Sequence, residues 1–422
     1  MSKNNLVSVV LFELEIGKLG FDENKNSSFF QYNPNFLTLE KYKNIFPLII
    51  KRVSPTQVFN SYNNETFRGL PPMIADSLPD SFGNIIFKNW LESNQKEFEK
   101  ISVLERLTYV SNRGIGALEF EPNIQLSKNI TINLNEIIVV LKKVMDKKNI
   151  TIEGDFNEVA LLNIIKDGTS AGGARPKIAI SENKKTLEIV PGDIEISENF
   201  NHYLVKLCLD DEMGYNREVV EFSYYQTALF LGIKMMPSKL IDKKHFATER
   251  FDRQNGKKLH VLTATGMTGW DFKKPENSSY ENLFELALFL KLPLNEINEL
   301  FTRMVFNVVF ANTDDHLKNH SFIYNPEKDC WNLSPAYDLT YAINPLLNYT
   351  RVTRALSING KRIEISLEDV LSIAKKFTIK NPKGIIKKVQ NAIENWEQNA
   401  IDLKISSIVI QKIKDDFKLF EL

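Results

Sequence analysis

The sequence contains few cysteines and no excess of charge, and both shortages exclude classes of protein. Cys208 and Cys330 are the two cysteines among 422 residues, and neither belongs to a CxxC pair. A disulfide framework and a cysteine-rich zinc site are therefore excluded. Lysine plus arginine equal aspartate plus glutamate, at 53 each. This balance does not favour DNA binding by the chain alone, because that binding depends on cations that neutralise phosphates.

Long hydrophobic runs are also missing. The apolar stretch near the N-terminus is interrupted by Glu13 and Glu15, which favours a strand over a signal peptide. No run approaches the length that a bilayer-spanning helix needs. We therefore expect a soluble, cytoplasmic protein with no membrane partner.

The pattern of the chain changes along its length, and the chain is too long for one small core. Strand-like runs with one helix come first, then strands and helices alternate, and helical periodicity dominates the remainder. Strands are expected at 7–14, 46–53, 187–190 and 203–208, and helices at 84–91, 218–231, 283–290, 300–310, 367–377 and 385–393.

These patterns predict an α+β fold with two lobes, a mixed α/β N-terminal half and a mostly helical C-terminal lobe. We expect a β-rich region at 1–125, an α/β region at 126–250 and the helical lobe at 251–422. Ligands commonly bind in the cleft between two lobes.

The segment NTDDHLKN, residues 312–319, directly follows a predicted helix and so forms a loop at a rigid helix end. Protein kinases place a carboxylate that accepts the substrate hydroxyl proton five residues before an asparagine that holds a metal ion. Asp314 and Asn319 have this spacing. The spacing alone is common by chance.

A third polar group strengthens the pattern. A hairpin is predicted at 321–324 and 330–333, and Asp338, in SPAYDLTY, follows it directly. The hairpin returns the chain to its starting point, so Asp338 is expected beside Asp314 and Asn319, where a kinase carries a second metal ligand.

The N-terminal half offers groups that could contact phosphate. The segment KDGTSAGGARPK, residues 166–177, is rich in small residues that let backbone N–H groups approach phosphate oxygens, although an ordinary surface loop is an equal alternative. Lys206 lies in the apolar strand HYLVKL and could point into the cleft or to solvent. Glu221, on the next predicted helix, is its candidate acidic partner or a solvated helix position.

The segment ATERFDR, residues 247–253, lies where the composition changes from one lobe to the next. A chain that crosses between lobes can offer backbone groups to an adenine edge. The simpler interpretation is the end of a strand with a local arginine–aspartate pair.

Taken in order, GTSAGGARPK, HYLVKL, the Glu221 helix, ERFDR, NTDDHLKN and SPAYDLTY resemble the HipA family of toxin–antitoxin kinases. The N-terminal segments FRGLPPMIADSLPDSFG and YVSNRGIGALEF are also similar to that family, so the resemblance spans nearly the whole chain. The ARPK ending and the TATGM segment indicate a divergent branch.

The resemblance implies a serine/threonine protein kinase that uses ATP and Mg²⁺. Asp314 would be the catalytic base, Asn319 and Asp338 would hold Mg²⁺, and Lys206 would contact the ATP phosphates. His316 and Lys318 would lie near the transferred phosphate. The implied nucleotide contacts are Ala171, Gly172, Gly173, Ala174, Arg175, Pro176, Lys177, Lys206, Glu249, Arg250, Phe251, His316, Asn319, Tyr337 and Asp338.

The resemblance also implies regulation and partners. HipA proteins phosphorylate a serine of their own phosphate loop, and Ser170 falls at that position, with Thr169 as the weaker candidate. The expected partner is a small helix-turn-helix antitoxin, HipB-like, with DNA contacted only through it. HipA substrates include an aminoacyl-tRNA synthetase, which implies a protein substrate that belongs to translation.

Several features stay open at this point. Asp315 stands where the family commonly has glycine, and could accept hydrogen bonds behind the site or lie harmlessly at the surface. It leaves open which of the two carboxylates is the base, although the spacing to Asn319 favours Asp314. RGIGAL lacks the third glycine of a dinucleotide fingerprint. The basic run at 375–388 is a solvated helix face or a DNA-backbone contact within a complex. The rival functions are a metal-dependent phosphohydrolase built on Asp314, Asp315 and His316, and a non-catalytic corepressor that bridges antitoxin and DNA.

Overall fold

The computed structural model describes residues 6–123, 137–139, 141–142, 175–192, 197–209, 215–346 and 352–422. No helix in these ranges is long and apolar enough to span a membrane.

The N-terminal region is built on a five-stranded antiparallel sheet with the order β4-β3-β2-β1-β5, which we call the N-terminal sheet. In β3, Ser28, Phe30 and Tyr32 are buried while Phe29 and Gln31 between them are less buried, an alternation that fits a sheet with one covered face. Four helices and one 3-10 helix accompany it. The elements are β1 (Leu6–Leu11), β2 (Leu14–Asp22), β3 (Ser27–Tyr32), α1 (Pro34–Leu37), β4 (Gln57–Phe59), α2 (Pro72–Ala75), α3 (Ser81–Ser93), η1 (Phe98–Lys100), α4 (Val103–Val110) and β5 (Leu118–Glu121).

The strand expected at 46–53 is wrong. This segment is irregular, although Phe46 and Ile50 are buried, so its apolar residues fill the core without joining a sheet. The Gln57 side-chain amide accepts from the Lys51 N–H and donates to the Lys51 carbonyl, both at 2.8 Å. A side chain therefore satisfies backbone groups that a neighbouring strand would otherwise pair.

The second sheet, which we call the central sheet, has the strand order β7-β6-β8-β10-β9. The strand expected at 187–190 is shifted, because Leu187 has a positive φ of 60° and lies in the preceding turn. The elements of this region are β6 (Lys177–Asn183), β7 (Ile189–Pro191), β8 (Phe200–Lys206), α7 (Arg217–Phe230), β9 (Ser238–Ile241) and β10 (His245–Glu249).

The helical lobe follows, and it contains the hairpin that the sequence predicts. Strand β13 joins this hairpin as a third strand that the sequence did not predict, pairing Thr263 with Ser321. The elements are β11 (Arg253–Gln254), β12 (Lys257–Lys258), β13 (Val261–Thr263), α8 (Ala264–Thr268), η2 (Pro275–Asn277), α9 (Tyr280–Phe289), α10 (Leu294–Val309), η3 (Leu317–Asn319), β14 (Ser321–Asn325), β15 (Cys330–Leu333), α11 (Leu367–Lys376), α12 (Pro382–Asp402) and α13 (Ser407–Asp415).

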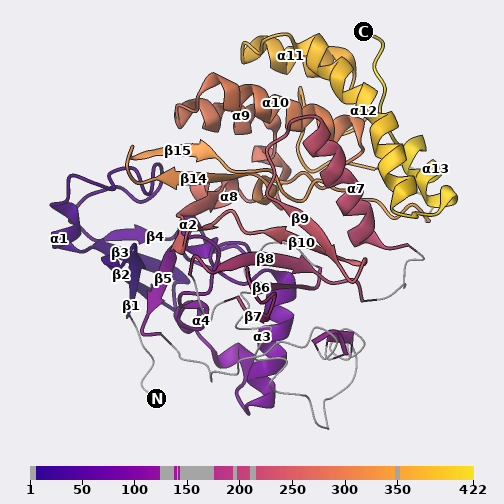
Figure 1. Ribbon diagram of the computed structural model, residues 1–422. Helices are drawn as coiled ribbons and strands as arrows, with labels where there is room; N and C mark the ends of the chain where they lie inside the picture. Colours follow the sequence, from indigo (N-terminus) through magenta and orange to yellow (C-terminus); the bar gives the residue numbers. More distant parts are fainter. Residues whose placement is uncertain are drawn as a thin grey trace.

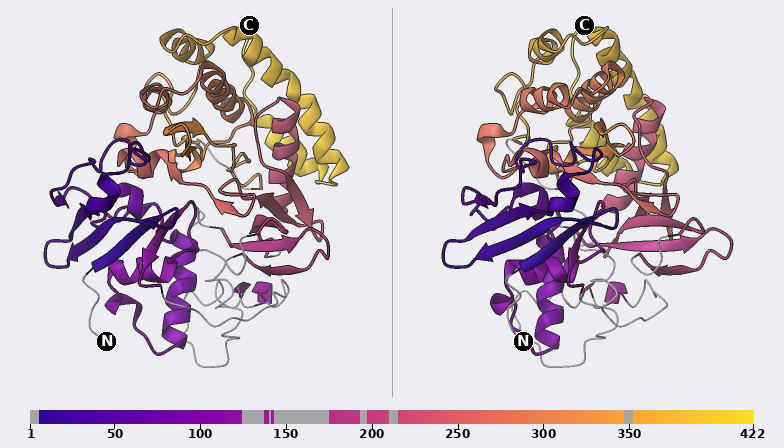
Figure 2. Two further views of the ribbon diagram at one scale, coloured as in Figure 1. Left: turned by 60° about the vertical axis from the view of Figure 1, so that its left-hand side comes forward. Right: turned by 90° about the vertical axis from the view of Figure 1, so that its left-hand side faces the viewer.

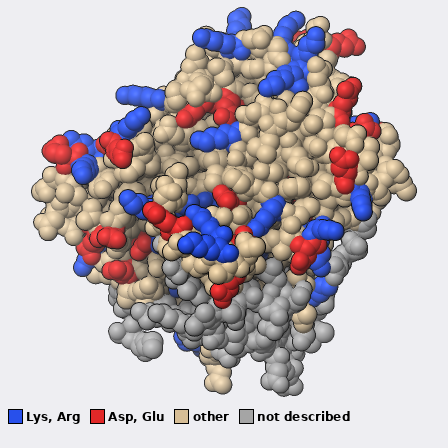
Figure 3. Space-filling model, in the orientation of Figure 1, with Lys and Arg blue, Asp and Glu red and all other residues tan. Residues whose placement is uncertain are grey.

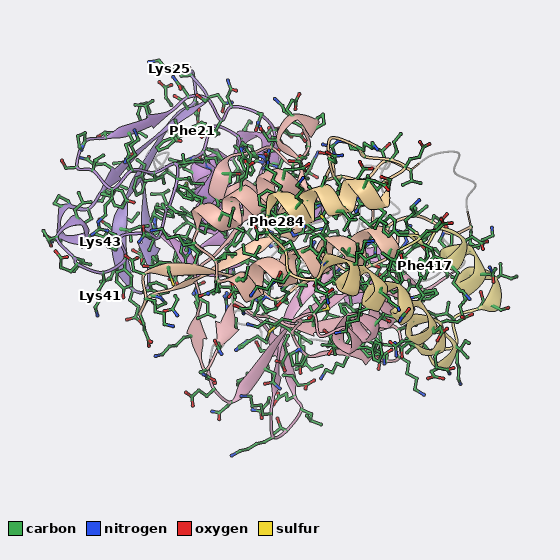
Figure 4. The ribbon with its side chains drawn as sticks, turned by 90° about the horizontal axis from the view of Figure 1, so that it is seen from above. Phe21, Lys25, Lys41, Lys43, Phe284 and Phe417 are labelled. Carbon is green, nitrogen blue, oxygen red and sulfur yellow. The ribbon has the colours of Figure 1, made fainter. Side chains whose placement is uncertain are left out.

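The arrangement is two-lobed, with the N-terminal sheet beside the central sheet and the C-terminal helices at the opposite end of the molecule (Figures 1 and 2). The view from above puts Lys25, Lys41 and Lys43 at the outer rim of the N-terminal region and Phe284 in the midst of the helices (Figure 4). Fully buried Phe30 and Phe284 belong to one apolar cluster. The N-terminal region and the helical lobe therefore share a core.

Candidate active site

The predicted catalytic loop connects the end of α10 to β14, as expected. The Asn319 amide donates to the Asp314 carbonyl at 2.8 Å, which closes the loop across its five-residue span. The Asp314 side chain is 71% exposed, and His316 Nε2 lies 4.0 Å from its carboxylate. The surrounding chain removes part of the water around the Asp314 carboxylate, and this desolvation raises its pKa. His316 opposes the shift, and the negative charges of Asp338 and Asp315 reinforce it. Because water reaches the carboxylate on one side, its charge remains partly screened.

Lys206 points into the protein and not to solvent. Its ammonium lies 2.6 Å from Glu221 Oε1 and forms a second ion pair with Asp338. Burial alone would lower the pKa of Lys206, but Asp338 and Glu221 raise it above its ordinary value. Burial likewise opposes ionisation of Asp338, yet Lys206 holds its pKa below the usual range. Strand β8, helix α7 and the segment after β15 thus bring three charged groups together.

The predicted phosphate loop is described from Arg175 onward. Ala171, Gly172, Gly173 and Ala174, and the candidate modification sites Ser170 and Thr169, lie outside the described residues. The Pro176 carbonyl accepts from Leu207 N–H at 2.9 Å.

Lys177 begins β6 directly opposite Lys206 in the antiparallel register. Its ammonium pairs at 2.8 Å with Asp80, a residue that the sequence did not single out.

The segment between the lobes combines aromatic and charged groups. The Phe251 ring stacks on Tyr337, with centroids 5.7 Å apart, and the Tyr337 hydroxyl donates to the Lys318 carbonyl at 2.7 Å. Glu249 accepts from Tyr203 at a long 3.4 Å. Arg250 is committed to Asp252, at 2.8 Å. The simpler sequence interpretation, a local arginine–aspartate pair, is therefore confirmed, and the adenine contact stays a prediction.

That arginine–aspartate pair also fastens the N-terminal region. Asp252 accepts from the Gly116 N–H at 2.8 Å, and Arg253 donates to the carbonyls of Gly114 and Gly116, both at 3.0 Å. The RGIGAL segment is thus a docking loop for ERFDR. Gly116 has a φ of +81°, which favours glycine.

His316 and Lys318 flank one aromatic ring. The His316 ring lies 5.0 Å from Phe272, and the Lys318 ammonium lies 5.4 Å above the same ring. Lys318 Nζ is also 4.0 Å from Asp76. Phe272 carried no signal in the sequence, because it lies in a loop far from the catalytic motif.

Asp315 is buried and accepts hydrogen bonds behind the site, so the surface alternative is wrong. It receives the Tyr280 hydroxyl at 2.7 Å, Arg354 at 2.6 Å and the Leu356 N–H at 3.3 Å. Asp315 therefore points away from Asp314, and the two carboxylates do not form a shared metal-binding cluster. Across the described ranges, no group of three or more His, Cys, Asp or Glu is arranged to hold a metal ion.

The donor set at the cleft suits a magnesium ion that is completed by phosphate oxygens. Asn319 donates through its amide nitrogen to Asp314, which leaves its side-chain oxygen for a ligand. Asn319 and Asp338 line the same cleft. Mg²⁺ is typically held by one or two protein oxygens together with substrate phosphates, so these two residues fit the implied ion.

Three parts of the chain line one cleft, which brings together the predicted site residues Lys206, Glu249, Arg250, Phe251, Lys318, Asn319, Tyr337 and Asp338. Asp314, His316, Arg175, Pro176 and Lys177 are not among its lining residues. The N-terminal region contributes a wall that the sequence analysis missed; its lining residues are Met73, Asp76, Ser77, Arg113 and Ile115. Both FRGLPPMIADSLPDSFG and RGIGAL supply this wall. The sequence showed that these two segments resemble the HipA family, but that resemblance did not indicate that they line the cleft.

The two lobes and the cleft define a kinase-like fold of the HipA type. A model of the HipA N-terminal domain matches residues 7–121, and a model of the HipA-like C-terminal domain matches residues 169–396. The chain therefore belongs to the HipA family.

Individual relatives are distant. Y4dM of Sinorhizobium fredii, named as a candidate kinase, is 26% identical over 42% of this chain. The serine/threonine-protein kinase toxin HipA of Shewanella oneidensis is 24% identical over 41% of it. The matches cover 44% and 43% of those proteins, less than half of each.

A solved complex of HipA, HipB and operator DNA from Shewanella oneidensis gives the structural comparison. It covers 97% of this chain and 96% of the matched chain, with a TM-score of 0.68 and 17% identity. At this identity the likeness shows a shared fold.

Proposed function

We propose that the chain is an ATP-dependent serine/threonine protein kinase and the toxin of a HipA-type toxin–antitoxin module. One observation carries the proposal: Glu221, Lys206 and Asp338 form a chain of ion pairs in the cleft that Asn319 also lines. Kinases require a lysine–glutamate pair and a metal-binding aspartate in place together. A solvated lysine or an isolated carboxylate would not produce this arrangement.

The chemistry follows from these groups. The acceptor hydroxyl oxygen forms a bond to the γ-phosphorus, the bond from that phosphorus to the bridging oxygen breaks, and ADP leaves. Asp314 accepts the hydroxyl proton, while Lys206, oriented by Glu221, holds the phosphate oxygens. When bound, Mg²⁺ held by Asn319 and Asp338 would neutralise charge on the phosphates.

Regulation and partners are part of the same proposal. Phosphorylation of Ser170 would add about two negative charges to a loop that holds ATP phosphates, and repulsion would end nucleotide binding. The Shewanella comparison, a complex with HipB and operator DNA, supports a HipB-like antitoxin as partner, with DNA reached through it. The expected substrate is a protein of translation, such as an aminoacyl-tRNA synthetase.

The test is incubation of the full chain with γ-labelled ATP and Mg²⁺, followed by phosphosite mapping. Wild-type protein should acquire label on Ser170, and Asp314→Asn should reduce the rate at least about 100-fold, because general base catalysis contributes factors of this order. Asp415→Asn, in α13, is the matched control and should transfer normally.

An Asp314→Asn protein with full transfer would remove Asp314 from its role as base. Release of inorganic phosphate without a labelled protein would instead favour the phosphohydrolase. ATP binding without either product would favour the non-catalytic corepressor.

A further inference from the structure

Two carboxylates, four residues apart, lie in the short segment between α2 and α3. Asp76 faces the helical lobe, where it accepts from the Thr263 N–H and hydroxyl, both at 2.9 Å. Lys318 Nζ lies 4.0 Å from the same carboxylate. Asp80 faces the central sheet and pairs with Lys177 at 2.8 Å. One segment of the N-terminal region therefore contacts both the helical lobe and the central sheet.

The two lysines belong to the candidate site. Lys177 is the cross-strand neighbour of Lys206. Burial lowers the pKa of Lys177, and the negative charges of Asp80 and Asp338 oppose that shift. Lys318 immediately precedes the proposed metal ligand Asn319 in the catalytic loop. Each lobe thus contributes one lysine, and each lysine has a carboxylate partner on the same short segment.

The segment holds its carboxylates firmly. Asp80 caps α3 by accepting from the Gly83 N–H at 2.6 Å, and Asn84 donates to the Asp80 carbonyl at 2.7 Å. Leu78, between the two carboxylates, is buried in the core shared with the helical lobe. The side chains of Lys177 and Asp80 are only 3% and 7% exposed. A pair so enclosed is weakly screened and constrains the position of both partners.

We propose that Asp76 and Asp80 form a bridge that fixes the positions of Lys318, which lines the nucleotide cleft, and of Lys177, which lies opposite Lys206 in the register of the central sheet. The inference rests on the proposed kinase function and extends it, because it makes the N-terminal region part of the phosphoryl-transfer unit. Asp76 and Asp80 act through the lysines, so they are positioning residues. Asp80 holds Lys177, the cross-strand neighbour of the phosphate-binding candidate Lys206, and Asp76 holds Lys318, which would lie near the transferred phosphate.

The bridge predicts a split between binding and transfer. In Asp80→Asn, Lys177 loses its anionic partner and leaves its position, so the Kd for an ATP analogue should rise about tenfold, equivalent to one pair interaction of ordinary size. In Asp76→Asn, the Kd should stay within about threefold of wild type, while the transfer rate falls at least about tenfold.

The experiment measures both quantities on the full chain. The Kd comes from titration with a fluorescent ATP analogue and Mg²⁺, and the rate comes from labelled-ATP transfer. Asp329→Asn is the matched control, because Asp329 also bonds across the boundary to the N-terminal region, to the Asn44 N–H at 2.9 Å, but lines no part of the cleft. Lys177→Met and the double variant with Asp80→Asn complete the cycle.

Non-additive losses of binding in Asp80→Asn and Lys177→Met would support the bridge. A wild-type Kd in Asp80→Asn would overturn the proposal, and so would strictly additive losses in the double variant. The control Asp329→Asn should lower only the melting temperature. The same result in Asp80→Asn and Asp76→Asn would also overturn the bridge. If Asp80→Asn does not fold, the Kd of Lys177→Met decides the question. An unchanged Kd in that variant would show that Lys177 has no part in nucleotide binding, so that its positioning by Asp80 has no effect on the site. A wild-type protein that binds the analogue but transfers no phosphate refutes the kinase proposal. The Kd values of Asp80→Asn, Lys177→Met and the double variant would still test whether Asp80 positions Lys177.

Discussion

A single buried carboxylate joins the catalytic loop to the segment that follows the proposed metal ligand. The Asp315 side chain is 0% exposed, and its partner Arg354 lies 39 residues further along the chain. Asn312 donates to the Asp338 carbonyl at 3.2 Å, and Ala355 N–H donates to the Thr313 carbonyl at 2.8 Å. The loop that carries the proposed base Asp314 and the segment that carries the proposed metal ligand Asp338 are therefore fastened to the same buried polar network, which specifies their relative positions.

Breaking this network should cost stability. Asp315→Asn leaves the Arg354 guanidinium buried without a countercharge, and such a change costs about 3–5 kcal/mol. Chemical denaturation should show this loss in the free energy of unfolding. Because the cost arises from the unpaired cation, the double variant Asp315→Asn with Arg354→Met should lose less than the sum of the single losses. Strictly additive losses would show that the two side chains do not act as a pair.

At the scale of elements, helical periodicity predicted α7 and α9–α12, and two strand-like runs around a turn placed the hairpin β14–β15 correctly. These elements are determined by local pattern, since a helix needs only its own apolar stripe. The segment 46–53 failed because its apolar residues contact the core through an irregular backbone, which periodicity does not distinguish from a strand. Strand β13 is three residues long, and its pairing partner lies about sixty residues away.

The candidate site divides in the same way. The positions of Asp314, Asn319 and Asp338 on one loop and one hairpin could be predicted, because helix, loop and hairpin are consecutive. The contacts of Asp76 and Asp80 could not, since each depends on a partner at least ninety residues away that only the tertiary fold brings near. No local pattern encodes such a contact.

Helix α8 offers a test of how closely the N-terminal region is packed against the helical lobe. A Cβ at Gly266 would lie 2.4 Å from Asp76 Oδ2, and Thr263 holds that carboxylate with two hydrogen bonds. Gly266→Ala should therefore destabilise the fold by about 1–3 kcal/mol, as overpacking commonly does. Thermal and urea unfolding measure the loss.

The clash can be separated from other effects of Gly266→Ala. In an Asp76→Gly background the three close Asp76 atoms, Oδ2 at 2.4 Å, Cγ at 2.6 Å and Cβ at 2.8 Å, are all gone, so adding Gly266→Ala should cost much less than it does in the wild type. An equal cost in both backgrounds would mean that the alanine is resisted by the helix itself and not by Asp76.

At the scale of the whole molecule, neither sign of charge dominates the visible face, where basic and acidic side chains are interspersed (Figure 3). The buried polar groups are more informative. His202, on β8, His260, between β12 and β13, and His320, after the catalytic loop, are all buried. Burial lowers the pKa of each from 6.5 to about 4.

These histidines make stability depend on pH, with a definite sign. Between pH 6.5 and about 4 the unfolded chain binds protons that the folded chain refuses, so the free energy of unfolding falls as the pH falls through this window. Above pH 6.5 the contribution is fully present, and below pH 4 the loss levels off. The raised pKa values of Glu218, Glu221 and Asp314 act in the opposite direction. The total slope therefore does not isolate the histidines.

A single substitution does isolate one of them. His260 packs against Trp331, with ring centroids 5.2 Å apart, and its Nε2 donates to the Ile45 carbonyl at 3.1 Å. His260→Gln keeps a donor near this position but cannot titrate. The wild type should lose up to about 3 kcal/mol more than the variant between pH 7 and pH 4, the equivalent of a pKa difference of about two and a half units. His260 contacts Ile45 of the N-terminal region and Trp331 of the helical lobe, so its protonation destabilises the fold where these two regions meet. Guanidinium unfolding curves at both pH values give the comparison, and identical losses in the two proteins would show that burial does not lower the pKa of His260.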